Sequence, residues 1–184
     1  MKRLALIIGA LLITLGAVAY FVVDHPWAWT TTAPLAAGSV AGPSINPAGL
    51  EITYIANEGV LISSGDKQVL IDGLHREYQR AYAFLPPAQR EKIENAQSPF
   101  DQIDLVLVSH MHLDHFHPES VGLHLKHNAN AVLVSSHQVV DAVEKDFKDF
   151  QAIKSRVTAA TPQWKERRAM KMAGVDLEIL GLRH

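Results

Sequence analysis

The stretch Ser-His-Met-His-Leu-Asp-His-Phe-His, residues 109–117, directly follows an apolar run, Leu-Val-Leu-Val, at residues 105–108. Four side chains of metal-binding type fall within six residues in the order H-x-H-x-D-H: His110, His112, Asp114 and His115. With His at 10 of 184 positions, chance produces this pattern on the order of once in a thousand such chains. Imidazole and carboxylate ligands together suit Zn²⁺, and also Fe or Mn. The sequence therefore predicts a metal site at the end of a strand.

The spacing within the motif predicts how the ligands divide. In an extended segment, side chains at positions i and i+2 point the same way. His110 and His112 can therefore hold one ion if the chain stays extended past Val108. Asp114 and His115 follow where the chain turns, and they can reach a second ion. Two ions roughly 3.5–4 Å apart can share a hydroxide and act as a paired Lewis acid. The alternative is a polar, partly exposed loop that is rich in histidine by chance.

Composition limits the class of protein. The 184 residues allow one domain with an appendage, and 48% hydrophobic residues are enough for a packed core. The net charge of −2 comes from 17 basic and 19 acidic residues, so no basic surplus points to nucleic acid as a partner. The chain has no cysteine, which excludes disulfides, Fe–S clusters and thiolate zinc sites. This absence also suits an oxidising compartment.

The first 29 residues predict either a signal-anchor or a signal peptide. Lys2 and Arg3 precede twenty uncharged residues, Leu4 to Val23, which as a helix span a hydrocarbon layer of roughly 30 Å. The positive end favours a cytoplasmic N-terminus. We therefore expect a single-pass protein of the cell inner membrane with its domain on the periplasmic, extracytoplasmic side. The alternative is cleavage after the small-x-small sequence at residues 17–19, which secretes the protein to the periplasm.

A flexible linker is expected at residues 30–49, where Thr, Ala, Gly and Pro accumulate, and a folded domain at residues 50–184. Alternating apolar residues and turn residues predict strands in that domain. These lie at residues 51–56, 59–64, 68–72, 104–109 and 131–135. Helices are predicted at residues 76–95, with an interruption at Pro86 and Pro87, and at 118–127 and 136–150. This alternation implies an α/β layered fold.

Other polar and aromatic residues receive structural interpretations. Tyr78 and Tyr82 are expected on a solvated face of their helix rather than in a substrate wall. His124 and His127 are expected at the surface of the next helix. His75 either lines the cleft or belongs to a surface loop. His117 is expected to be a loop residue, with support of a metal ligand as the alternative. Ser135 and Ser136 can cap the helix that follows them.

The motif and its surroundings resemble the metallo-β-lactamase-fold hydrolases, whose central motif is H-x-H-x-D-H at the end of a strand. Residues 52–62 and 67–73 are similar to the opening β-meander of that family, in which an Asp ends the strand before the first helix. Asp72 matches this Asp, so the resemblance implies that it lies beneath the metal centre and supports the ligand loop. The resemblance covers about residues 50–184. It implies the N-terminal part of a metallo-β-lactamase αββα sandwich, preceded here by one hydrophobic helix.

Within the family, the strand-loop form of the motif and the following Pro118 are most similar to one branch. This branch contains ascorbate-6-phosphate lactonase and the N-acyl-phosphatidylethanolamine phospholipase D enzymes. The family also has a third histidine ligand after a later strand. Residues 175–183 fit that strand, and His184, the last residue, fits that ligand. The family's later bridging Asp and final His have no counterpart, so we expect an incomplete domain, by truncation rather than as a degenerate half-domain.

Together these features predict a hydrolase in which a metal-bound hydroxide cleaves an ester, lactone or phosphodiester bond. His110, His112 and His184 would hold the first ion, and Asp114 and His115 the second. Asp114 would also orient the nucleophile, which makes it the catalytic candidate. We expect zinc, with two ions in the complete enzyme, and a small-molecule or lipid-like ester as substrate. Fe or Mn are alternatives. The competing function is a membrane-tethered, non-catalytic metal-binding or interaction module.

Overall fold

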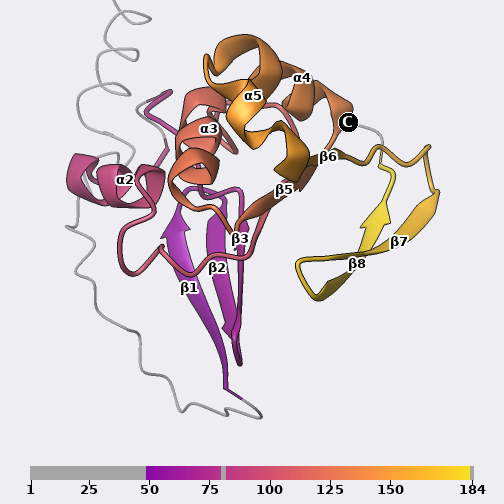
Figure 1. Cartoon of the computed structure of the whole chain (residues 1–184), viewed down its shortest axis with the longest axis horizontal. Coiled ribbons are helices and arrows are strands. Elements are labelled where there is room, and N and C mark those ends of the chain that lie inside the picture. Colours follow the sequence, from indigo (N-terminus) through magenta and orange to yellow (C-terminus); the bar gives the residue numbers. More distant parts are fainter. Residues whose placement is uncertain (1–48, 80–81, 183–184) are drawn as a thin grey trace, which may run out of the picture. The chain divides into compact units, whose positions relative to one another are not determined.

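The computed structural model describes residues 49–79 and 82–182 (Figure 1). The predicted membrane span or signal peptide, the linker up to residue 48, and His184 lie outside these residues. Within the described part of the chain, no helix combines the length and apolar character needed to cross a membrane.

Six strands form a mixed sheet in the order β1-β2-β3-β4-β5-β6. They are β1 (Leu50–Ala56), β2 (Gly59–Ser64), β3 (Lys67–Ile71), β4 (Leu105–Val108), β5 (Val132–Ser135) and β6 (Val157–Ala159). The first three strands are antiparallel because short turns join them, whereas β3 to β6 are parallel and are joined by longer connections, as parallel pairing requires. The five strands predicted from the sequence are confirmed to within two residues, and β6 is an additional strand.

Helices pack on one face of this sheet and enclose the main hydrophobic core. They are α2 (Pro87–Glu94), α3 (Pro118–His127), α4 (His137–Asp146) and α5 (Phe150–Ile153), followed by the short 3-10 helix η1 (Lys154–Arg156). Leu70, Val106 and Leu133, at matching positions of neighbouring strands, point into this core and are at most 1% exposed. The helix starts follow local chemistry, since proline occupies the first turn of α2 and α3, and Ser136 caps α4 by accepting a hydrogen bond from the Val139 amide.

A separate two-stranded sheet packs on the opposite face. It consists of β7 (Arg167–Met172) and β8 (Val175–Leu180), which form an antiparallel hairpin (Figure 1). Apolar side chains of the hairpin contact the central strands of the large sheet through a second, smaller core. The hairpin members of this core are Met170, Met172, Ala173, Val175, Leu177 and Ile179. The result is a mixed α/β fold, as predicted, and its central sheet is mixed. The strand β8 confirms the strand expected near residue 175.

The hairpin covers this face only in part. Ile52 pairs with Ile62, which pairs with Val69, so the three side chains share one face. Val69 contacts the second core, whereas Ile52 on the edge strand is 63% exposed. Leu50 and Tyr54, two positions away on either side, are also exposed. An apolar row on β1 therefore remains uncovered by the described residues.

Two helix predictions are wrong in part. Of the helix predicted at residues 76–95, Pro87–Glu94 is the only helical part among the residues that the structure describes. The preceding chain is held by distant partners instead: Leu74 forms a β-bridge with Phe116, and the Arg76 side chain donates hydrogen bonds to Glu94 and Ser120. The residue before a proline also disfavours helix, and here Pro86 precedes Pro87. The helix predicted at residues 136–150 ends at Asp146 and is followed by the separate α5.

Candidate metal centre

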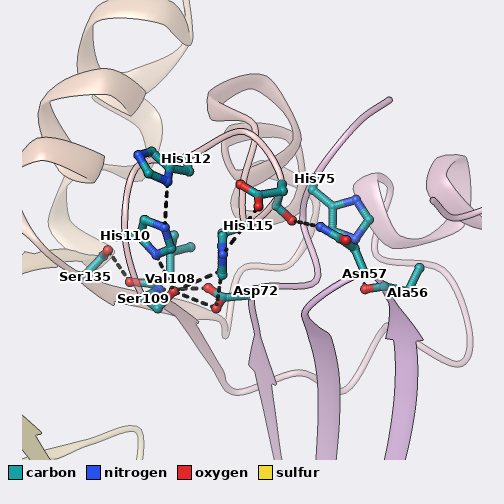
Figure 2. A network of polar contacts seen from close by, with 11 residues as sticks. Ala56, Asn57, Asp72, His75, Val108, Ser109, His110, His112, His115 and Ser135 are labelled. Atoms are coloured by element: carbon teal, nitrogen blue, oxygen red, sulfur yellow. Dashed lines mark hydrogen bonds and ion pairs between the residues drawn. The ribbon is translucent and has the colours of Figure 1, made fainter. Parts of the chain in front are cut away.

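The histidine-rich loop begins where β4 ends, at the edge where the parallel strands β3, β4 and β5 finish side by side (Figure 2). The β5 residue Ser135 donates a hydrogen bond from its hydroxyl to the Val108 carbonyl, and this contact fixes the last residue of β4. The chain turns after His112, whose carbonyl accepts hydrogen bonds from the amides of His115 and Phe116. Strand end and turn together gather the motif side chains in one place.

Asp72 is the anchor of this loop. It follows β3 directly, is 5% exposed, and its amide donates to the Leu107 carbonyl of β4. Its carboxylate accepts the Ser109 amide at 2.8 Å and the Ser109 hydroxyl at 2.7 Å. The His115 Nδ1 atom lies 2.9 Å from the same carboxylate. A buried carboxylate is thus satisfied by the first residue of the loop and by one of its imidazoles.

These contacts define which ring nitrogens carry hydrogen. A carboxylate only accepts, so His115 donates from Nδ1 and its Nε2 atom is left as the acceptor in the neutral ring. The single hydroxyl hydrogen of Ser109 is used on Asp72, so the Ser109 oxygen accepts from His110 Nδ1 at 3.0 Å. His110 then also presents Nε2 with a lone pair. Neutral imidazole held in this way by an outer carboxylate or hydroxyl is the form that binds metal ions.

The motif donors lie in two pairs. His112 Nδ1 donates a hydrogen bond to His110 Nε2 at 3.1 Å, and His115 Nε2 is 3.8 Å from Asp114 Oδ2. Imidazole with carboxylate is a donor set that zinc accepts. The donor types that are present therefore fit zinc in chemistry.

The described residues do not form a complete ligand set. Within residues 49–79 and 82–182, no three or more His, Cys, Asp or Glu side chains are arranged to hold one ion. His184, the third ligand that the resemblance implies for the first ion, lies outside these residues. The ligand assignments of His110, His112, Asp114 and His115 therefore stay predictions.

Asn57 also contacts the loop, although no sequence motif indicates a role for it. Its side-chain amide donates to the Asp114 backbone carbonyl, 57 positions along the chain. Asn57 sits in the β1–β2 turn with a φ of 48°, and the preceding Ala56 has a φ of 141°. Both lie in the positive-φ region that side chains rarely adopt, although Asn tolerates it better than most. An Asn in a tight turn between two strands is a sequence signal for this conformation, but not for the partner.

Two further histidines lie near the loop. His75 is 2% exposed, and burial lowers its pKa. Its Nε2 atom lies 3.2 Å from the Ala56 carbonyl oxygen, so it contacts the β1–β2 turn and is not a surface loop residue. His117 is the residue that precedes α3, as expected for a loop residue, and burial also lowers its pKa.

A cavity of about 280 Å³ opens beside the motif and is lined by His112 and Asp114. The other lining residues are Tyr78, Gln79, Tyr82, Met111 and Leu113. Tyr78 and Tyr82 were expected on the solvated face of a helix. The segment is not helical at these positions, and both rings face this cavity instead.

Comparison with known proteins agrees with this architecture. Residues 51–174 match the family described as "Beta-lactamase superfamily domain". The chain is also 27% identical over 126 residues to "UPF0173 protein YddR" of Bacillus subtilis (strain 168). This similarity covers 58% of the present chain and 49% of that protein. The chain thus spans about half the length of the curated relative that it matches.

Proposed function

Because the chain belongs to the beta-lactamase superfamily, with the metallo-β-lactamase fold, we propose that it is a metal-dependent hydrolase of ester, lactone or phosphodiester bonds. The observation that carries this proposal is the gathering of three imidazoles and two carboxylates at the end of β4. Members of this superfamily typically bind zinc, and the donor types at the loop suit it. Fe and Mn are accepted by the same donor types and are the alternatives.

The proposed zinc ligands are the two donor pairs of the loop. His110 and His112 would hold one ion and Asp114 and His115 a second, with His184 as the third ligand of the first. When bound, zinc supplies Lewis acidity, which polarises the scissile bond and makes water a better nucleophile. The donor types of the loop and the fixed tautomers of His110 and His115 support this assignment.

The chain's own residues then have separate tasks. Asp72 and Ser109 hold two imidazoles in one tautomer, so that little reorganisation is needed when a cation arrives. Asn57 fixes the backbone at Asp114. The carboxylate of Asp114 lines the cavity, where it can accept a hydrogen bond from water and orient it towards a substrate, as the proposed catalytic residue.

The proposal extends to the architecture and location of the whole protein. The helices, the six-stranded sheet and the β7–β8 hairpin correspond to three layers of an αββα sandwich in the described residues. The twenty uncharged residues from Leu4 to Val23 support an inner-membrane anchor or an export signal. A domain held on the periplasmic side would meet small-molecule or lipid-like esters.

Hydrolysis by the zinc-loaded full-length chain tests the proposal. We expect turnover of p-nitrophenyl acetate or bis(p-nitrophenyl) phosphate that is lost with a chelator, and a kcat/KM at least about 100-fold lower in His112→Ala. His127→Ala is the matched control because it removes an exposed histidine on α3, away from the loop, and it should keep the wild-type rate. Equal rates in His112→Ala and wild type would refute the metal mechanism. Zinc binding by the wild type without any turnover would instead favour the non-catalytic module.

A further inference from the structure

We infer that the cavity beside the histidine-rich loop, residues 109–117, binds an apolar group of the substrate. This group would have the size of a phenyl ring or a short acyl chain. This inference rests on the proposed function, because it concerns the compound that the loop would hydrolyse. His112 and Asp114, two of the proposed ligands, line the cavity together with aromatic and aliphatic side chains. A group bound there lies next to the scissile bond.

The motif itself supplies one wall of the cavity. The residues between the proposed ligands are apolar, and both are unusually accessible: Met111 is 47% exposed and Leu113 is 44% exposed. An exposed apolar residue by itself is common, but here two of them alternate with the donor residues and face the same cavity. Methionine adapts its shape to different ligands and makes favourable contacts with aromatic rings. The loop therefore presents apolar surface where a substrate must approach.

The segment after β3 supplies the opposite wall. The rings of Tyr78 and Tyr82 are stacked, with centroids 6.3 Å apart and an interplanar angle of 24°. Phe84 meets Tyr82 edge to face at 6.4 Å, so the tyrosine is supported from behind. Tyr78 is nevertheless 48% exposed. Tyrosine side chains that are packed on one side and accessible on the other give a rigid aromatic surface at low entropic cost.

The size of the cavity limits what it can hold. Pockets that enclose a drug-sized ligand have about 300–1,000 Å³, whereas this cavity has about 280 Å³. It therefore suits one small group rather than a whole lipid or a polymer. Aromatic stacking and the thioether of Met111 both favour a flat, apolar group.

Binding of phenylacetate and acetate to the zinc-loaded full-length chain tests this inference, with the methionine methyl groups labelled with ¹³C and observed by NMR. The two carboxylates differ by one phenyl ring, so their difference isolates the apolar group. We expect phenylacetate to bind about tenfold more tightly than acetate and to shift the Met111 methyl resonance. Met170 and Met172 are internal controls, because they pack between the hairpin and the sheet and should not shift.

Two leucines of equal exposure give matched variants. Leu113 lines the cavity and Leu180 lies on β8, and each is 44% exposed. Leu113→Ala and Tyr78→Ala should each lower the preference for phenylacetate about threefold, whereas Leu180→Ala should leave it unchanged. Equal affinities for both carboxylates, or a preference untouched by Leu113→Ala and Tyr78→Ala, would overturn the inference. If phenylacetate binds more tightly than acetate but hydrolysis does not depend on His112, the inference about the cavity stands and the proposed hydrolase function is refuted.

Discussion

The loop after β4 and the helix α3 both carry closely spaced histidines, but the two regions use them differently. On α3, His124 and His127 are three positions apart and share one face of the helix. His124 Nδ1 lies 2.6 Å from the Ile93 carbonyl oxygen, and His127 Nδ1 lies 3.1 Å from that of Glu94. Both rings therefore donate to the end of α2. In the loop, by contrast, the ring nitrogens face one another or a carboxylate.

This difference teaches what separates a structural histidine from a candidate ligand. Spacing alone would allow either pair to hold an ion, because both put two imidazoles on one side of the chain. The hydrogen-bond partner makes the difference: on α3 a backbone carbonyl accepts the ring N–H and ties two helices together, whereas in the loop a carboxylate or a hydroxyl accepts it and fixes the tautomer. His124, expected at the surface, is fully buried for this reason, and that prediction is wrong.

Removing one loop histidine should give the largest effect. His110→Ala is expected to weaken zinc binding about a thousandfold, since four ligands of a structural site together contribute about 10–16 kcal/mol. Its free energy of unfolding in the absence of metal should change little. Competition with a chromophoric chelator measures the affinity, and His127→Ala serves as the control. If both variants weaken zinc binding equally, the contrast between the two regions is not functional.

The buried histidine of α3 should make stability depend on pH. Burial lowers the pKa of His124 to about 4, with smaller lowering effects of His127 and Arg156 and an opposing effect of the hydrogen bond to Ile93. Because the folded state holds this proton less tightly than the unfolded chain, stability is present above pH 6.5 and is lost as the pH falls towards 4. The loss attributable to this residue is about 3 kcal/mol.

Urea unfolding at pH 7 and near pH 4.5 measures this loss in the wild type and in His124→Gln. The variant should be less stable at pH 7, but its free energy of unfolding should fall less between pH 7 and pH 4.5. His127→Ala should retain the wild-type dependence, because its side chain is exposed. If the free energy of unfolding falls with pH as steeply in His124→Gln as in the wild type, other groups, such as the buried His75, cause the pH dependence.

The next largest effect, on zinc affinity, is expected from the Asp72 carboxylate, which holds the loop. Asp72→Asn replaces an oxygen that accepts hydrogen bonds from Ser109 and His115 by an amide that cannot serve both. We expect zinc affinity to fall about 10- to 100-fold, as for other groups that orient a metal-binding histidine. Asp104→Asn is the matched control, since the Asp104 carboxylate also accepts a hydrogen bond from a backbone amide, that of Gln68 in β3, but does not contact the loop. Comparable zinc affinity in both variants would contradict the anchoring role.

The smallest effect is expected at the β1–β2 turn. Asn57→Ala removes the hydrogen bond to Asp114 and places a side chain that tolerates positive φ poorly. We expect about a three- to tenfold loss of kcat/KM, equivalent to the roughly 1 kcal/mol of one hydrogen bond. Asn57→Gly keeps the backbone conformation and removes only the hydrogen bond. A wild-type rate in Asn57→Gly would assign the effect to the turn, and a loss in both variants would assign it to the contact with Asp114.

The sequence predicts the framework better than the connections within it. Strands with regular alternation and the helix at Pro118 are found as predicted, because their patterns are local. The strand β7 escaped prediction because Arg167, Arg168 and Lys171 interrupt its apolar residues. The chain before Pro87 was wrongly predicted as helix for another reason, because its conformation depends on partners far along the chain.

The candidate site shows the same division. The spacing of the motif was sufficient to predict which side chains gather after β4, and the structure places them together. The arrangement of hydrogens on His110 and His115 depends on Ser109 and on Asp72 of a neighbouring strand, which no local pattern reveals. The same holds for Asn57, whose partner is 57 positions away.

The β7–β8 hairpin has a consequence for how the molecule opens. It belongs to its own two-stranded sheet and is joined to the large sheet through a small side-chain core. Cooperative units of a protein follow such boundaries, so the hairpin can detach in a local fluctuation while the six-stranded ladder stays closed. Its amides will then exchange with solvent sooner than those of β4, and the histidine-rich loop, which follows β4, keeps its order on the slower timescale of the main core.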